Sequence, residues 1–108
     1  MKDSLLIASK HKKTIEYIFK ITDNYPNKYM NLKSRIINTS FDILENIYII
    51  NNSSNHKEYL IPKIKMLDYM MYLSYKYNII TKKKYETISN YLLELIKMIH
   101  SWLYEKSK

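Results

Sequence analysis

Residues 85–103 read YETISNYLLELIKMIHSWL, and hydrophobic side chains recur along them with the period of an α-helix. The stripe on one side consists of Ile88, Leu92, Leu95, Ile99 and Leu103. Polar side chains occupy the opposite side, as in a helix that packs one face against a core. The stretch therefore predicts a long amphipathic helix over about residues 82–106.

Three earlier segments show the same period and are separated by turn-forming residues. The breaks at 23–27 and 51–55 are rich in Asn, Asp and Ser, whose side chains bond their own backbone. A weaker break at 78–81 ends in Thr81, which can serve as an N-cap. The stripes of the three segments are Ile7, Ala8, His11, Ile15, Ile18, Ile21 and Thr22, then Leu32, Ile36, Ser40, Ile43, Ile47 and Ile50, then Leu60, Ile64, Leu67, Met71 and Ser74.

We expect a single domain, residues 1–108, with helices over about residues 3–22, 30–50, 57–77 and 82–106. Short connections make successive helices antiparallel. The predicted fold class is therefore all-α, an up-down-up-down four-helix bundle.

Composition limits the function classes. The chain has no Cys and no Gly, which excludes disulfides, thiolate metal sites and glycine-dependent phosphate loops. There are 18 Lys and Arg residues against 10 Asp and Glu, a formal net charge of +8. Ile, Lys, Asn and Tyr, which have AT-rich codons, make up more than half of the chain. The basic charge thus reflects codon bias as well as any role in binding.

The three histidines, His11, His56 and His100, give no catalytic or metal-binding pattern. None has a second His, Asp or Glu at the i+3 or i+4 position that would form a ligand pair on one helix face. His11 falls on the apolar face of its segment and His100 beside the last stripe, so both are interpreted as core residues. We expect no enzyme activity, no metal site and no cofactor.

Lysine clusters are the stronger lead to a partner. Residues 10–13 hold three lysines, and residues 82–84 are all Lys, at a predicted helix start where the helix dipole disfavours cations. Lysines neutralise phosphates without reading sequence. The candidate nucleic-acid-binding residues are Lys10, Lys12, Lys13, Lys82, Lys83, Lys84 and Lys97. The alternative is a solvated, codon-biased face.

The third segment is hydrophobic nearly all round, which a single bundle cannot cover. Such leftover apolar surface marks an interface, so we expect self-association through this helix. The candidate interface residues are Met66, Met70, Tyr72, Leu73 and Trp102. Two alternatives remain open: a tyrosine-rich face that stays in water, and a Trp102 that covers the core of one bundle. Pro62 occupies either the first turn of the helix or a kink.

No targeting segment is apparent, and no stretch approaches the ~18 consecutive apolar residues of a membrane span. We expect a cytoplasmic protein with no membrane partner.

Residues 64–104 resemble the Avd family, the accessory variability determinants of diversity-generating retroelements. The stretch 79–86, IITKKKYE, is similar to the family's connection into its last helix. In 94–103, ELIKMIHSWL, Glu94, Lys97, Ser101 and Trp102 fit the family's closing motif, whereas Ile96 and His100 replace glycines. Asp68 and Tyr72 stand where the family commonly has arginines.

A related group comprises the four-helix-bundle proteins of ribosomal-RNA intervening sequences, whose usual motif in the second helix is missing from residues 36–50. The Avd resemblance implies a basic, non-catalytic homopentameric ring. Its partners would be a reverse transcriptase and template RNA, with DNA as an alternative nucleic-acid ligand. The ring would support mutagenic cDNA synthesis. The alternative function is a structural or protein-interaction bundle of the intervening-sequence type without a nucleic-acid role.

Overall fold

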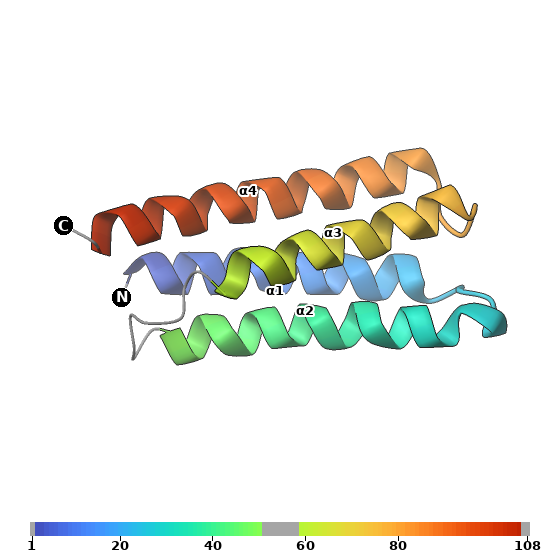
Figure 1. The fold of residues 1–108 in the computed structure, drawn as a ribbon, viewed down its shortest axis with the longest axis horizontal. Helices are drawn as coiled ribbons and strands as arrows, with labels where there is room; N and C mark the ends of the chain where they lie inside the picture. Colours follow the sequence, from blue (N-terminus) through green and yellow to red (C-terminus); the bar gives the residue numbers. More distant parts are fainter. Residues whose placement is uncertain (1, 51–58, 107–108) are drawn as a thin grey trace.

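A computed structural model describes residues 2–50 and 59–106 of the chain, and these residues form helices without a strand. The elements are α1 (Lys2–Thr22), the short 3-10 helix η1 (Asn27–Tyr29), α2 (Met30–Ile50), α3 (Leu60–Lys76) and α4 (Lys82–Lys106). The four α-helices lie side by side and alternate in direction (Figure 1). The expected all-α four-helix bundle is confirmed.

The helices stand at the corners of a square in cross-section. Consecutive helices pack against each other, and α4 closes the bundle by packing against α1. The bundle is elongated, with dimensions of 46 × 21 × 19 Å. The α1–α2 connection and the α3–α4 connection therefore lie at the same end (Figure 1).

Most of the core consists of the hydrophobic stripes that the sequence predicts. The largest fully buried side chains are Ile7, Ile18, Ile36, Ile43, Ile47, Leu60, Ile64, Leu67, Met71, Ile88, Leu92 and Leu95. All belong to those stripes, and each stabilises the fold by about 1.5–3 kcal/mol relative to exposure. The side chain of Leu103, the last expected stripe residue, lies outside the described residues.

His11 is fully buried, as its place on the apolar face predicts. Its Nε2 lies 2.7 Å from the carbonyl oxygen of Ser40, so this nitrogen carries the proton and donates it. The other ring nitrogen, Nδ1, is buried without a hydrogen-bond partner among the described residues. Desolvation by burial lowers the pKa of His11 and outweighs the opposite effect of the bond to Ser40. The imidazole is thus held neutral in the core.

His100 does not join the core. It is exposed on α4, contrary to the expectation, whereas the preceding Ile99 is fully buried. Successive residues of an α-helix are rotated by about 100°, and this rotation turns His100 away from the stripe that Ile99 continues.

The start of α3 resolves the question of Pro62. The helix begins at Leu60, so Pro62 lies in its first turn, where its missing N–H breaks no intrahelical bond. The expected helix start at residue 57 and the turn at residues 51–55 lie outside the described residues.

Candidate nucleic-acid interface

The corner between α3 and α4 is built by two local motifs. Asn78 has φ 61°, the left-handed conformation that ends many helices. Around it, the N–H of Ile79 donates to the carbonyl of Ser74 at 2.8 Å, and the N–H of Asn78 donates to that of Tyr75 at 2.9 Å. These are the two bonds of a Schellman motif. Thr81 then caps α4, because its Oγ1 accepts a bond from the N–H of Lys84 at 3.2 Å.

A cluster of tyrosine rings lies where α3 packs against the start of α4. The rings of Tyr75 and Tyr85 are stacked with centroids 5.9 Å apart and an interplanar angle of 7°. Tyr72 meets Tyr85 edge-on at 5.8 Å and Tyr75 at 6.3 Å. Tyr69 stacks on Tyr72 at 6.4 Å. The four rings form one continuous aromatic surface along α3 and α4.

The hydroxyl of Tyr85 lies near the side chains of Ser89 and Asp68. Partial burial, and less strongly the negative charge of Asp68, raises the pKa of Tyr85 above its usual value, while the interaction with Ser89 opposes this effect. The Oδ1 atom of Asp68 is buried and has no hydrogen-bond partner among the described residues.

Lysines surround the same corner. Lys82, Lys83 and Lys84 are exposed in the first turn of α4, which contains no acidic residue. The Nζ of Lys76 lies 6.0 Å from the centroid of the Tyr72 ring. Positive charge and exposed tyrosine side chains therefore occur together, a combination that suits both the phosphates and the bases of a nucleic acid.

The neighbouring α1–α2 connection, at the same end of the bundle (Figure 1), repeats the combination on a smaller scale. Tyr29 of η1 and Tyr77, which follows α3, have ring centroids 6.5 Å apart. The Nζ of Lys28 lies 5.2 Å from the Tyr29 ring. Basic and aromatic side chains thus continue from α3 toward the α1–α2 connection.

The lysines predicted on α1 lie elsewhere and do not join the corner. Lys10 forms an ion pair with Glu94, with Nζ 3.1 Å from Oε2, and its Nζ also lies 5.4 Å from the Tyr91 ring. Lys12 points toward α2, with its Nζ 5.6 Å from the ring of Tyr48. Lys13 lines a small hollow of about 130 Å³ between α1 and α4. These side chains are divided between two sides of the bundle.

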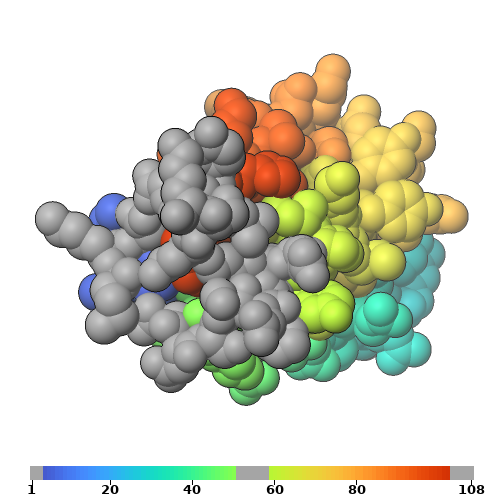
Figure 2. All heavy atoms as spheres, turned by 60° about the vertical axis from the view of Figure 1, so that its left-hand side comes forward, coloured from blue at the N-terminus to red at the C-terminus, as the bar shows by residue number. Residues whose placement is uncertain are grey.

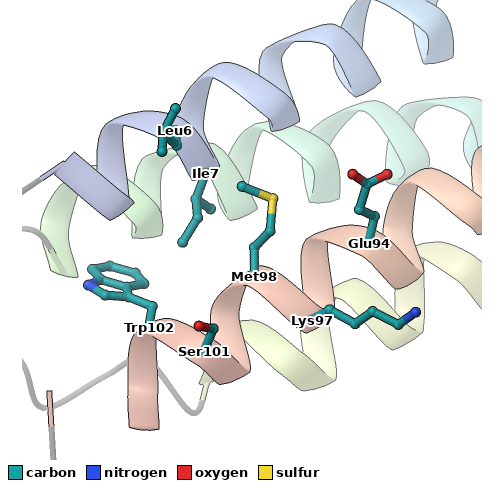
Figure 3. Close-up of a pocket in the computed structure, with 7 residues that line it drawn as sticks. All are labelled: Leu6, Ile7, Glu94, Lys97, Met98, Ser101 and Trp102. Atoms are coloured by element: carbon teal, nitrogen blue, oxygen red, sulfur yellow. The ribbon is translucent and has the colours of Figure 1, made fainter. Parts of the chain in front are cut away.

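Lys97 borders a different feature, a pocket of about 300 Å³ between α1 and α4. Leu6, Ile7, Met98 and Trp102 make its apolar wall, with Glu94, Lys97 and Ser101 at its polar edge. In Figure 3 the ammonium group of Lys97 extends along α4 away from Trp102. Lys97 is thus separated along α4 from the first-turn lysines.

The candidate interface residues also occupy two environments. Met66 and Tyr72 are exposed, at 47% and 37%, and Leu73 is half-buried. Met70 and Trp102 belong to the core, at 5% and 2% exposed. Trp102 therefore covers the core of a single bundle, which is one of the two alternatives left open by the sequence.

Sequence reasoning missed the contribution of Tyr75 and Tyr85 to the corner. Tyr85 follows the lysine run directly, but its contact with Tyr72 and Tyr75 depends on the register between α3 and α4. One signal was available: the repeated occurrence of tyrosines three residues apart beside lysines in residues 69–85.

Two further properties concern the described residues. Within residues 2–50 and 59–106, no group of three or more His, Asp and Glu side chains is placed to hold a metal ion. None of the helices there has both the length and the hydrophobicity required to cross a bilayer.

Comparison of the chain with models of protein families, with curated proteins and with solved structures finds no match. The fold and the lysine–tyrosine corner define the class of molecule to which the chain belongs: a four-helix bundle with a basic, aromatic corner.

Proposed function

We propose that this chain is a non-catalytic accessory protein that binds RNA through the corner between α3 and α4. The observation that carries the proposal is the placement of Lys82, Lys83 and Lys84 beside the ring cluster of Tyr72, Tyr75 and Tyr85. Cations in the first turn of a helix oppose its dipole. Their placement there is accounted for by contact with an anionic partner.

The resemblance of residues 64–104 to the Avd family adds the specific partners. In that proposal the chain belongs to a diversity-generating retroelement, assembles as a homopentameric ring and supports its reverse transcriptase on template RNA. A ring would multiply each lysine cluster by the number of subunits and strengthen the attraction to RNA. The chain itself would work in the cytoplasm and carry out no chemistry.

The test of RNA binding is fluorescence anisotropy with a labelled structured RNA and a matched duplex DNA, each titrated over a salt series. We expect sub-micromolar binding that favours RNA and weakens steeply with salt. Replacing the first-turn lysines of α4 (K82Q/K83Q/K84Q) should reduce the salt slope by about 2 to 3, since each phosphate contact adds ~0.7–0.9.

The matched control is K10Q/K12Q/K13Q, which removes the same charge from α1. We expect a smaller change, because Lys10 is already paired with Glu94. Equal losses in the two variants would indicate attraction by net charge alone. Affinity of wild type no tighter than ~10⁻⁴–10⁻⁶ M at physiological salt would contradict RNA binding as the function.

Assembly has a separate test. Light scattering should give a multiple of the 13.2 kDa chain mass, five-fold for the proposed ring. A monomer over the whole accessible concentration range would overturn the ring and leave RNA binding to be judged on its own titration.

A second candidate function is a protein-interaction bundle, and one observation favours it. Phe19 of α1 and Phe41 of α2 are 47% and 44% exposed, and their ring centroids lie 5.8 Å apart. This apolar pair lies on the side of the bundle away from the α3–α4 corner and is suited to a protein partner. An F19S/F41S variant that loses reverse-transcriptase capture but keeps RNA affinity would assign the two faces separate roles.

A further inference from the structure

The outward face of α3 carries an ordered pattern of basic and aromatic side chains. Lys65, Tyr69, Tyr72 and Lys76 follow one another at i, i+4, i+7 and i+11, so they share one side of the helix. All four are exposed, Tyr69 at 54% and Tyr72 at 37%. We refer to these four residues as the α3 stripe. Figure 2 shows α3, in yellow-green to yellow, at the surface between α4 in orange and α2 in green to cyan.

The two rings of the α3 stripe are held in place before any ligand arrives. Tyr69 stacks on Tyr72 with an interplanar angle of 27°. Tyr72 in turn packs edge-on against Tyr85 at 5.8 Å, and Tyr85 stacks on Tyr75 at 5.9 Å. A ring that is already positioned loses little side-chain entropy when a partner stacks on it.

The charges of the α3 stripe are all positive. Lys65 lies one turn before Tyr69, and the Nζ of Lys76 lies 6.0 Å from the Tyr72 ring. The acidic residue nearest in sequence, Asp68, is half-buried near the hydroxyl of Tyr85. The complementary ligand is therefore a polyanion that also offers flat aromatic faces.

A two-fold contact with a second copy of the chain fits this surface poorly. A two-fold contact places the same patch on both subunits, so the lysines of one α3 stripe would meet the lysines of the other. Like charges opposed across an interface are costly. A duplex also fits poorly, because its bases stack on each other and present no free faces.

We infer that the α3 stripe binds single-stranded nucleic acid, with bases stacked on Tyr69 and Tyr72 and phosphates near Lys65 and Lys76. This inference rests on the proposed RNA-binding function and specifies the form of nucleic acid. The two ring centroids are 6.4 Å apart, about twice the ~3.4 Å rise of a stacked strand. The strand is thus bound extended, with one base for each ring and little dependence on sequence.

The test compares a labelled oligothymidine and oligouridine of about 12 nucleotides with a duplex of the same length. Tyr69→Ala should weaken single-strand binding about 5- to 150-fold, the range for loss of one base–aromatic stack. Tyr69→Phe keeps the ring and should bind as wild type does. Tyr48→Ala is the matched control, since Tyr48 is 45% exposed and has Lys12 over its ring on another side of the bundle.

The possible results separate this inference from the function on which it rests. Loss of single-strand affinity in Tyr69→Ala, with duplex affinity and helical content unchanged, supports the inference. If Tyr69→Ala and wild type bind single strands equally, and K82Q/K83Q/K84Q still reduces binding, the inference about the α3 stripe is overturned. The proposal of RNA binding is then unaffected. Absence of binding to every nucleic acid in wild type overturns both. A changed mass by light scattering in Tyr69→Ala identifies the stripe as a subunit contact and overturns the inference as well.

Discussion

The hydroxyl of Tyr25, in the connection after α1, donates a 2.7 Å hydrogen bond to Oγ of Ser74 on α3. Both side chains are buried, at 5% and 0% exposed. The hydroxyl of Ser74 in turn donates a hydrogen bond to the carbonyl of Met70 at 3.0 Å. The bond ties the α1–α2 connection to the end of α3, beside the turn that positions the lysines of α4.

Removing the donor and removing the acceptor of this bond should lower stability by different amounts. Tyr25→Phe leaves Ser74 with its bond to Met70, so we expect a loss of about 1 kcal/mol. Ser74→Ala leaves the Tyr25 hydroxyl buried without an acceptor, and the expected loss is about 1–3 kcal/mol. Urea unfolding of both variants and of the double variant measures the coupling. Strictly additive losses would show that the bond contributes nothing of its own.

The burial of Tyr25 should also make the free energy of unfolding depend on pH in the alkaline range. Burial raises the pKa of Tyr25 above its usual value, and the bond to Ser74 only partly opposes this effect. Above pH ~10 the unfolded chain releases this proton while the folded chain keeps it. Stability should therefore decline as pH rises past that point, and the decline should be shallower in Tyr25→Phe. Identical alkaline profiles for the two proteins would contradict this assignment.

His11 gives the corresponding prediction on the acid side. Because burial lowers its pKa in the folded state, the unfolded chain binds a proton there first as pH falls. The free energy of unfolding should be highest above pH ~6.5 and should fall below it, until the folded state also takes up the proton. Urea titrations of His11→Gln should show a reduced slope over this range. An unchanged slope in His11→Gln would contradict this assignment.

The hydrophobic period was sufficient to predict the fold and most of the core. Burial in a square bundle follows helix geometry, so Ile36, Ile64 and Leu95 could be assigned to the core from their spacing alone. The burial of Tyr25, outside the stripes, could not be predicted in this way. Tyr25 was read as part of a turn, and its burial depends on the bond to Ser74, which lies 49 residues away.

The candidate site was predicted less completely, because it depends on how the helices align. The lysines of residues 10–13 form one cluster in the sequence, but successive helical positions point in different directions. Lys10 consequently meets Glu94 on α4, whereas Lys12 meets Tyr48 on α2. The contact between Tyr72 and Tyr85 likewise requires the register of α3 against α4, which the single sequence does not contain.

Substitutions of Asn78 should show whether the turn after α3 depends on the backbone angle at this position or on the Asn side chain. Its positive φ is unfavourable for residues with a Cβ, by roughly 1–2 kcal/mol, although Asn tolerates it better than most. We expect Asn78→Ala to lose about 1 kcal/mol of stability and Asn78→Gly to match or exceed wild type. Thermal unfolding of the pair measures the difference. A Gly variant as unstable as the Ala variant would mean that the Asn side chain itself, and not the backbone angle, holds the turn.

Lys83 should show opposite effects on stability and on binding. It is exposed in the first turn of α4, where the helix dipole favours an acidic residue. Lys83→Glu should therefore raise the free energy of unfolding by about 0.3–1 kcal/mol. The same change removes a cation from the proposed RNA surface and should weaken RNA binding, with the salt slope reduced by about 1.

The matched control is Lys97→Glu, which makes the same charge change at an exposed position in the body of α4, away from its first turn. It should weaken RNA binding less and leave stability within about 0.5 kcal/mol of wild type, as for most surface substitutions. Urea unfolding and anisotropy on the same preparations give both quantities. If Lys83→Glu gains stability without losing affinity, the first-turn lysines do not contact RNA, and the lysines of α4 serve only as solvated charge.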